Sequence, residues 1–496
     1  MRMVAFVSVV APAVLLRVWE INALGFNSDE AVYAGQGASI AGHNEFLGSF
    51  PVFRAHPLLF QSVLSVLYRD EVSDLVGRLA AATFGVATVG VVYLFGREMY
   101  GRSVGYVAAL LMAVMPYHVV VTRQVLLDGP MTFFAALTLL LIAKHAKTSN
   151  SLYFYLGAGA LGLAVISKEP AVLFIGGVYA FYALARVGHV RLHQVIVAST
   201  LFVLTVLPFP LSLKFSGRTS TGNQFLSYQI FRKPNHTWTF YFTEVPPAMG
   251  RLVLAAAAGG LIALWPRRTW REALLCCWIV VPLGFFELWP VKGFQYLLPT
   301  VPAVTVLAAR AVVSIPREAL RRRYLDQSRW ITSVAVLALV VSLALPSWHA
   351  IQPSNADTNF LAGSGGVPGG REAGRWVAEN VPEGARMLAI GPSMANIVMF
   401  YGHRETYGLS VSPNPLHRNP VYEPVVNPDN LIRQSEIQYL VWDAYTASRT
   451  EFFTRKLERY VERYHGRAVY TFSIEVEDAD GKLVQQPVIV IYEVRP

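Results

Sequence analysis

Residues 75–121 read LVGRLAAATFGVATVGVVYLFGREMYGRSVGYVAALLMAVMPYHVVV, two apolar runs joined by a short basic turn. An α-helix needs about 20 residues to cross the hydrocarbon core of a bilayer, and each run approaches that length. Arg97 and Arg102 lie in the turn, and positive residues between two spans are typical of a cytoplasmic loop. The segment therefore predicts a pair of membrane-spanning helices.

Apolar runs of this kind recur through the first 350 of the 496 residues. Only 15% of the residues are charged and 54% are hydrophobic, whereas an average soluble protein has roughly 25% charged residues. The mean hydropathy is +0.40. This composition argues against a water-soluble enzyme and predicts an α-helical membrane protein with about 11 transmembrane helices. The predicted spans are Met3–Trp19, Leu75–Phe95, Val104–Val121, Pro130–Ala146, Leu152–Ile166, Ala171–Ala185, Val195–Leu211, Arg251–Trp265, Leu274–Leu288, Tyr296–Val313 and Ile331–Leu345.

The charge pattern predicts which ends of these helices face the cytoplasm. The net charge is +10, but the basic residues cluster in short loops between apolar runs, so they indicate membrane topology and not a nucleic-acid partner. By the positive-inside rule these loops and the N-terminus are cytoplasmic, with Met1–Glu20 as an uncleaved first span. Eleven spans then place everything after about Trp348 outside, in a multi-pass protein of the plasma membrane.

The composition divides the chain into three parts. Residues 1–349 form the predicted transmembrane domain, with a long external loop at residues 22–74, and residues 350–371 form a linker with a Gly-rich stretch. Residues 372–496 alternate predicted helices and strands, which is typical of a small α/β domain. The predicted helices are Glu372–Glu379 and Thr450–Tyr464, and the predicted strands are Arg386–Ile390, Ile437–Trp442, Ala468–Ile474 and Pro487–Val494.

The predicted external loops are long or carry charge at the membrane boundary. Charged groups there cost free energy unless they are partnered or hydrated, which makes them functional candidates. A site is therefore expected at the outer leaflet. The five loops are Asn22–Asp74, Tyr117–Gly129, Ser167–Pro170, Lys214–Pro247 and Trp289–Gln295.

The first external loop contains the sequence Asn27-Ser28-Asp29-Glu30. An Asn three residues before a Glu predicts a capping box at a helix start, and Asp29 complements the helix dipole. Two carboxylates at the outer leaflet also permit general-base catalysis, in which one deprotonates an acceptor hydroxyl for attack on an activated sugar carbon. Both interpretations hold together, since a cap also fixes the position of the carboxylate.

Cationic residues on the same face are candidates for binding a phosphate. Arg54 and His56 stand before an apolar run, where a helix N-terminus and a guanidinium both favour an anion, although a His before Pro is commonly a helix-start residue. Lys168 and Lys292 lie at the outer ends of spans, where an ammonium could neutralise the charge that develops on a leaving lipid phosphate. Each lysine also has a structural alternative. For Lys168 it is a salt bridge at a helix start marked by a Pro, and for Lys292 it is a membrane-flanking position beside the interfacial Tyr296.

The loop after the third predicted span contains Arg123 and Asp128. A separation of five residues means that the two side chains need not pair with each other. One interpretation is that both snorkel at a helix boundary. The other is that both face a central cavity, with Asp128 near the acceptor or a water and Arg123 near the first carboxylates.

The sequence contains neither an EF-hand spacing nor a Gly-rich phosphate loop after a strand. A nucleotide-sugar or ATP site is therefore unsupported, and an enzyme that faces outward has no nucleotide sugar to use. A polyprenyl phosphate sugar in the membrane would supply the donor. A divalent cation is compatible with its phosphate, but no ligand set in the sequence demands one.

A series of short motifs lies along the first 310 residues: Asp29–Ala34, His56–Leu59, Gly77–Leu79, Tyr93–Arg97, Tyr100–Gly101, Pro116–His118, Arg123, Leu127–Asp128, Ser167–Lys168 and Gln295–Pro299. In their order and placement they resemble the GT-C glycosyltransferases of family 39, which include protein O-mannosyltransferases and the bacterial lipid A aminoarabinose transferase. In that family the acidic residue at the start of the first external loop is taken as the catalytic base. The resemblance implies this role for Asp29, with Glu30 beside it, and a second acidic position in the cavity at Asp128.

The sequence therefore predicts a membrane protein of GT-C type with a small extracytoplasmic α/β domain. The predicted activity is inverting transfer of a hexosyl or pentosyl group from a polyprenyl phosphate to a hydroxyl of a glycan, lipid or protein acceptor. A lipid-linked sugar flippase or other secondary transporter is the main alternative, in which the same charges would line a path; a receptor or scaffold leaves the loop charges unexplained. The predicted site residues are Asp29, Glu30 and Asp128 for catalysis, Arg54, Lys168 and Lys292 for the donor phosphate, and His56, Arg123 and Tyr296 in the substrate cavity.

Overall fold

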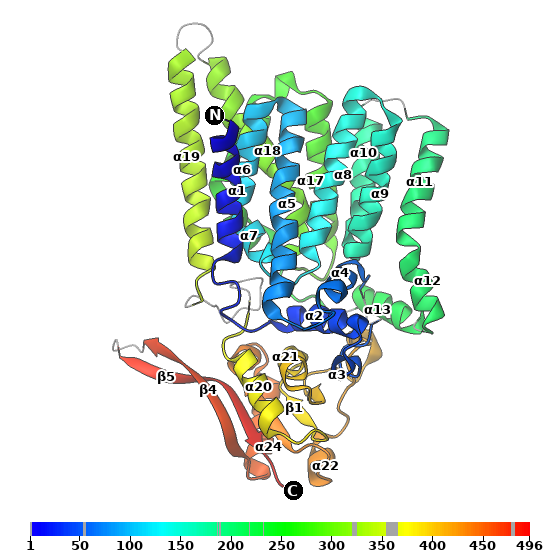
Figure 1. Ribbon diagram of the computed structural model, residues 1–496, viewed down its shortest axis with the longest axis vertical. Coiled ribbons are helices and arrows are strands. Elements are labelled where there is room, and N and C mark those ends of the chain that lie inside the picture. Colours follow the sequence, from blue (N-terminus) through cyan, green and yellow to red (C-terminus); the bar gives the residue numbers. More distant parts are fainter. Residues whose placement is uncertain are drawn as a thin grey trace.

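A bundle of long helices forms the larger part of the molecule, and a smaller α/β domain packs against one end of it (Figure 1). The N-terminus lies toward the opposite end of the bundle (Figure 1). This computed structural model describes the whole chain except residues 1, 53–55, 186, 188–189, 218, 232, 320–324, 354–365 and 478–481.

Each of the eleven predicted spans falls on an observed helix or on a pair of consecutive helices. Within the described residues, five helices are long and apolar enough to cross a membrane, or seven if each of two bent pairs is one span, and three shorter apolar helices accompany them. The protein is therefore a multi-pass membrane protein, while the count of eleven stays a prediction. The helices are α1 (Arg2–Val18), α5 (Asp74–Tyr100), α6 (Arg102–Val114) with α7 (Pro116–Thr122), α8 (Asp128–Thr148), α9 (Ser151–Ser167), η1 (Glu169–Val172) with α10 (Leu173–Ala185), α11 (Leu192–Val206) with α12 (Pro208–Phe215), α16 (Arg251–Ala263), α17 (Trp270–Leu288), η3 (Phe294–Thr300) with α18 (Val301–Ala319), and α19 (Leu325–Ala350).

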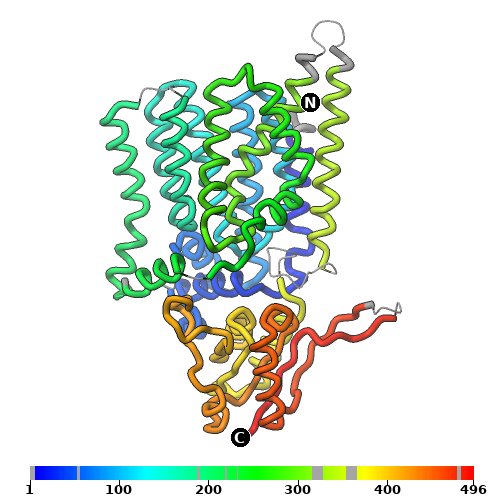
Figure 2. Tube along the Cα trace, turned by 180° about the vertical axis from the view of Figure 1, so that it is seen from behind, coloured from blue at the N-terminus to red at the C-terminus, as the bar shows by residue number. Residues whose placement is uncertain are grey.

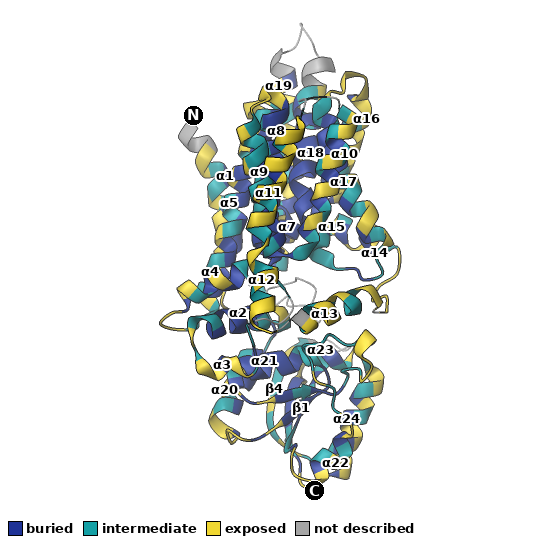
Figure 3. Ribbon diagram, turned by 90° about the vertical axis from the view of Figure 1, so that its right-hand side faces the viewer, coloured by how far each residue is buried: buried dark blue, intermediate teal, exposed yellow. Residues whose placement is uncertain are grey.

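Burial separates the helices that form the core from those that face outward (Figure 3). Every residue of α7 is buried, whereas Ala198 is the only buried residue of α11. Leu192 and Leu204 of α11 are 76% and 58% exposed. An apolar helix with nearly all of its side chains exposed is expected where lipid surrounds the protein.

Breaks in the helices bring polar residues to the end of the bundle that faces the small domain. The chain bends by 59° between α6 and α7, where Pro116 has no backbone N–H to continue the helix. Short helices cover this end (Figures 1 and 3). They are α2 (Ser28–Ala41), α3 (Asn44–Leu47), α4 (Leu59–Leu67), α13 (Thr219–Phe231), α14 (Phe240–Thr243) and α15 (Val245–Met249).

The C-terminal domain contains a five-stranded sheet in the order β2-β1-β3-β5-β4. Strand β1 pairs in parallel with β2 and β3, whereas β5 is antiparallel to β3 and β4, and the long β4–β5 hairpin extends to one side (Figure 2). The predicted α/β domain is confirmed, although α21, β2 and α22 were not predicted. The elements are α20 (Gly370–Asn380), β1 (Met387–Ala389), α21 (Pro392–Gly402), β2 (Thr406–Gly408), α22 (Pro428–Arg433), β3 (Tyr439–Asp443), α23 (Ala444–Ala447), α24 (Glu451–Arg463), β4 (Arg467–Glu477) and β5 (Leu483–Glu493).

Candidate active site

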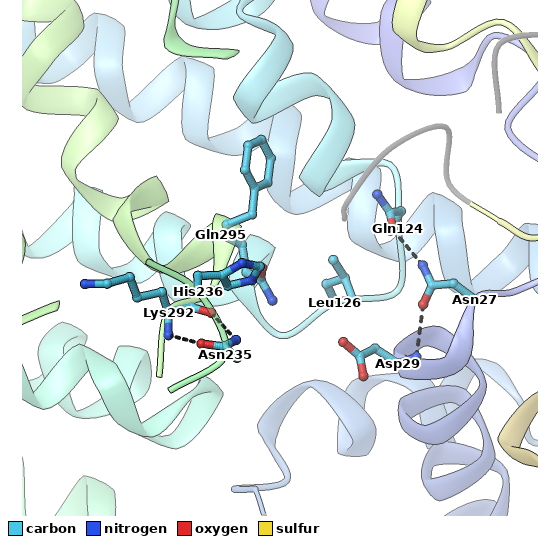
Figure 4. A pocket seen from close by; sticks show the side chains of 10 residues that line it. Asn27, Asp29, Gln124, Leu126, Asn235, His236, Lys292 and Gln295 are labelled. Carbon is cyan, nitrogen blue, oxygen red and sulfur yellow. Dashed lines mark hydrogen bonds between the residues drawn. The ribbon is translucent and has the colours of Figure 1, made fainter. Parts of the chain in front are cut away.

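A cavity of about 150 Å³ lies at the end of the bundle that carries the short helices (Figure 4). Segments from four of the five predicted external loops meet around it, so these loops share one face of the protein. The lining residues are Asn27, Asp29, Gln124, Leu126, Asn235, His236, Lys292, Gly293, Phe294 and Gln295.

Asp29 lies on this cavity because of how helix α2 begins. The side-chain oxygen of Asn27 accepts hydrogen bonds of 3.0 Å from the backbone N–H groups of Asp29 and Glu30, as a helix cap does. The Asn27 amide in turn donates to Gln124 at 2.7 Å. The Asp29 side chain stays exposed, and none of the described residues donates a hydrogen bond to its carboxylate. The cap thus fixes the backbone while the carboxylate remains free to accept a proton.

Glu30 has a different environment, although it is the next residue along the chain. Its side chain is fully buried, and both carboxylate oxygens accept hydrogen bonds of 2.8 Å from Arg78 of helix α5. The backbone N–H groups of Val125 and Asn27 also donate to it, each at 3.1 Å. Glu30 is not among the residues that line the cavity, so these contacts favour a structural role, and its predicted catalytic role stays a prediction. No role was predicted for Arg78, although an arginine inside an apolar run is a signal that could have identified it.

Glu30→Gln is therefore expected to destabilise the protein. The amide keeps the size of the side chain but leaves the buried Arg78 charge unpaired, which typically costs roughly 3–5 kcal/mol of unfolding free energy. Thermal unfolding of the purified protein in detergent should show a clearly lower Tm, whereas Glu71→Gln, at an exposed position of the same loop, should leave the Tm unchanged. An unaltered Tm in Glu30→Gln would contradict the structural role.

A buried ion pair lies beside the cavity. The Lys168 ammonium donates to both carboxylate oxygens of Asp128, at 2.7 and 2.9 Å, and the two side chains are 6% and 1% exposed. Lys168 occupies the extended break between α9 and η1, and its nitrogen lies 5.3 Å from the centre of the Tyr296 ring. Since an ammonium has three N–H donors, one remains after the two bonds to Asp128.

Tyr33 lies within electrostatic reach of Asp29, of Asp128 in this ion pair and of Glu169. The phenol is buried, and its pKa is raised by burial first and then by the negative charges of Asp29, Asp128 and Glu169. It therefore stays protonated. The Nδ1 atom of His56 lies 3.0 Å from both carboxylate oxygens of Glu169, and the His56 ring packs edge-on against Tyr33. We call Asp29, Tyr33, His56, Asp128, Lys168, Glu169 and Tyr296 the polar cluster.

Lys292 lines the cavity, but its ammonium points away from Asp29 (Figure 4). It donates to the carbonyl oxygens of Phe286 and Glu287, at 3.3 and 2.8 Å. A cation at this position complements the C-terminal end of helix α17. These contacts favour a structural role for Lys292, and its predicted phosphate-binding role stays a prediction.

Of the predicted site residues that the structure describes, only Asp29 and Lys292 are part of the cavity lining; the predicted cavity residues His56, Arg123 and Tyr296 are not. Arg123 is buried at the end of α7 and donates to the backbone oxygen of Leu16 at 3.0 Å, so it joins α7 to α1; its neighbour Gln124 lines the cavity instead. Arg54 lies outside the described residues, and its role stays a prediction. No group of three or more His, Cys, Asp or Glu among the described residues is placed to hold a metal ion.

The fold is that of the GT-C membrane glycosyltransferases. ArnT from Cupriavidus metallidurans bound to undecaprenyl phosphate is similar at a TM-score of 0.67 and 14% identity, over 98% of this chain and 97% of ArnT. The apo form of ArnT gives a TM-score of 0.70. The Archaeoglobus fulgidus oligosaccharyltransferase, in complex with zinc and sulfate, is similar at a TM-score of 0.61 and 16% identity, over 97% of this chain and 72% of that chain. The predicted resemblance to the GT-C group is confirmed.

A family model matches part of the chain. Residues 55–211 match the family described as dolichyl-phosphate-mannose-protein mannosyltransferase. This range contains His56, Asp128, Lys168 and Glu169 of the polar cluster. An uncharacterized protein of Aquifex aeolicus (strain VF5) is 28% identical over 210 residues, which are 40% of this chain. The match spans 41% of that curated relative's own length.

Proposed function

We propose that the protein transfers a sugar from a polyprenyl phosphate to an acceptor hydroxyl at the outer face of the membrane, with inversion at the sugar carbon. The observation that carries the proposal is the exposed Asp29 carboxylate, held by a helix cap on a cavity beside a buried lysine. Similar proteins support the kind of donor: ArnT was solved bound to undecaprenyl phosphate, and archaeal AglB with a dolichol phosphate and an inhibitory peptide.

In this proposal the acceptor binds in the cavity beside Asp29. Asp29 deprotonates the acceptor hydroxyl as that oxygen attacks the sugar carbon from the side opposite the lipid phosphate. The other polar side chains of the lining suit a hydroxyl-bearing ligand, since Asn27, Gln124 and Gln295 are neutral amides. The pKa of His236 is lowered by burial and then by Arg449, so this ring is neutral near pH 7. The Lys292 ammonium points away from Asp29, toward the backbone oxygens of Phe286 and Glu287.

In the same proposal the donor phosphate binds at Lys168 of the polar cluster. The third N–H of its ammonium is available for a phosphate oxygen. Negative charge grows on the phosphate as the sugar departs, so a preorganised cation there stabilises the transition state more than the bound donor. Arg54 is retained as a predicted third contact.

Consumption of the donor distinguishes transfer from transport. Purified protein is incubated with radiolabelled polyprenyl phosphate hexose or pentose and a membrane extract of the source cells as acceptor. Transfer releases free polyprenyl phosphate and moves the label into another molecule. A flippase or other transporter would move the lipid across a bilayer and leave it intact, which would overturn the proposal.

The proposal also places the soluble domain outside the cell, and cysteine labelling should show this. We expect Ser435→Cys, in the C-terminal domain, to react with a membrane-impermeant maleimide in intact cells, and Ser149→Cys, in the α8–α9 turn, to react only after lysis. Both positions are exposed, and both native cysteines, Cys276 and Cys277, are replaced by Ser in the background. Labelling of both positions from the same side would contradict the topology.

A further inference from the structure

The segment that leads into Asp29 is in contact with the C-terminal domain along most of its length. The backbone N–H of Val367 donates to the Gly25 oxygen at 3.1 Å, and the two residues form an isolated β-bridge. Arg371, in the first turn of α20, donates to the backbone oxygens of Asn22 and Leu24 at 3.2 and 3.0 Å. A domain more than 300 residues away in the sequence thus holds the backbone just before helix α2.

Asp74, the first residue of α5, binds two residues of the C-terminal domain. Arg371 reaches its carboxylate at 2.8 Å, and the Tyr401 hydroxyl also donates to it. The same hydroxyl accepts a 2.7 Å hydrogen bond from the backbone N–H of Phe26. Burial and the Asp74 charge raise the pKa of Tyr401, so its hydroxyl keeps the proton that this arrangement needs. Tyr401 therefore joins the soluble domain, helix α5 and the segment that carries Asp29.

Two further contacts complete the arrangement next to Asp29. The Asn396 amide donates to the Ser28 hydroxyl at 2.9 Å, one residue before Asp29. The fully buried Phe26 ring packs against Phe400 and Tyr401, with ring centres 5.2 and 6.3 Å away. Asn396, Phe400 and Tyr401 all belong to helix α21.

The membrane domain also holds this segment. Arg78 donates to the backbone oxygens of Ile21 and Leu24, at 2.9 and 2.7 Å, in addition to its pairing with Glu30. The segment is therefore held between α5 and the soluble domain. Removal of the contacts from the soluble domain would leave the segment held by the membrane domain alone.

We propose that the C-terminal domain positions the base of the transfer reaction, with Tyr401 and Arg371 as positioning residues that act through residues 22–28 on Asp29. The inference rests on the proposed role of Asp29. Neither residue touches the cavity, so each acts on where the Asp29 carboxylate lies and not on the reacting atoms. A small misplacement of a catalytic group can cost up to about 100-fold in rate.

Tyr401→Phe tests this role with a minimal change. The variant keeps the buried ring but leaves the Phe26 N–H without its acceptor and Asp74 without one donor. We expect kcat to fall about 10-fold or more while KM for the polyprenyl phosphate donor stays within about twofold, because Lys168 lies on α9–η1, apart from the segment. Hydrogen–deuterium exchange should rise in peptides that cover residues 21–30. Tyr407→Phe is the matched control, since that hydroxyl bonds Glu405 within the same domain, and it should leave both constants unchanged.

A second variant separates positioning from simple stability. Arg371→Lys keeps a positive charge near Asp74 but loses the planar fork that reaches two backbone oxygens, so its kcat should lie between those of the wild type and Arg371→Met. An unchanged kcat in Tyr401→Phe, or a lower Tm with normal kcat, would overturn the inference while Asp29→Asn remains inactive. Normal turnover in Asp29→Asn would instead overturn the proposed function itself.

Discussion

Asp29→Asn should lower the rate of sugar transfer by about 1,000-fold while the protein remains folded. General-base catalysis is worth roughly 10²–10⁴ in rate, and an amide cannot accept the acceptor proton. The substitution keeps the shape of the side chain, and the cap on α2 depends on Asn27 and not on Asp29. The Tm should therefore change by little. Steady-state kinetics with labelled donor and varied acceptor would measure the loss, which should appear in kcat.

The control for this variant lies in the same external loop. Asp70→Asn removes a carboxylate at an exposed position away from the cavity lining, and it should retain full activity. If Asp29→Asn kept near-normal turnover, Asp29 would not be the base. Asp128 would then be the remaining carboxylate of the predicted catalytic set that belongs to the polar cluster.

Lys168→Met should reduce kcat by about 100-fold or more and weaken donor binding. The effect follows from the loss of a preorganised cation where charge develops on the leaving phosphate. The same substitution leaves the Asp128 carboxylate buried without its partner, which also destabilises the protein. Kinetics with donor and acceptor varied separately should show a defect on the donor side and little change in the KM for the acceptor.

A double variant separates these two effects. In Lys168→Met with Asp128→Asn no buried charge is left unpaired, so the Tm should recover toward that of the wild type while transfer stays slow. Lys147→Met is the matched control, because Lys147 is about half-exposed and pairs with Glu98. Recovery of activity together with the Tm would show that Lys168 only stabilises Asp128, and it would remove Lys168 from the phosphate site.

The sequence predicted the helices of the bundle well because each is an apolar run bounded by polar residues. It also predicted that His56, Asp128, Lys168 and Tyr296 share one end of the bundle, since helices that cross a membrane return their loops to the same side alternately. Their detailed partners were not predictable from composition. Which carboxylate meets which cation depends on how α2, α5, α8 and α9 pack.

Glu30 shows why adjacent residues can differ in role. Asp29 and Glu30 are equivalent in the sequence, but consecutive side chains of a helix point about 100° apart. One of them therefore faces the cavity and the other faces Arg78, which lies 48 residues along the chain. The contacts of Lys292 were not predictable for a related reason: the sequence does not reveal that its ammonium turns toward the end of α17.

The contact between the two domains was also beyond the sequence analysis. Arg371 and Asp74 are separated by 297 residues, and neither belongs to a motif that indicates a partner. Strand β2 has only three residues, too few for an alternating pattern to show. The position of the soluble domain over residues 22–28 emerges only from the three-dimensional arrangement.

If Asp29 is the catalytic base, the protein consumes a polyprenyl phosphate sugar only while this carboxylate is present. The most direct measurement follows labelled donor in proteoliposomes that contain the wild type, Asp29→Asn or Asp70→Asn, with extraction of the lipid to quantify free polyprenyl phosphate. The account predicts release of polyprenyl phosphate and glycosylated acceptor by the wild type and by Asp70→Asn, and intact donor with Asp29→Asn. Intact donor that crosses the bilayer at the same rate with all three proteins would contradict it.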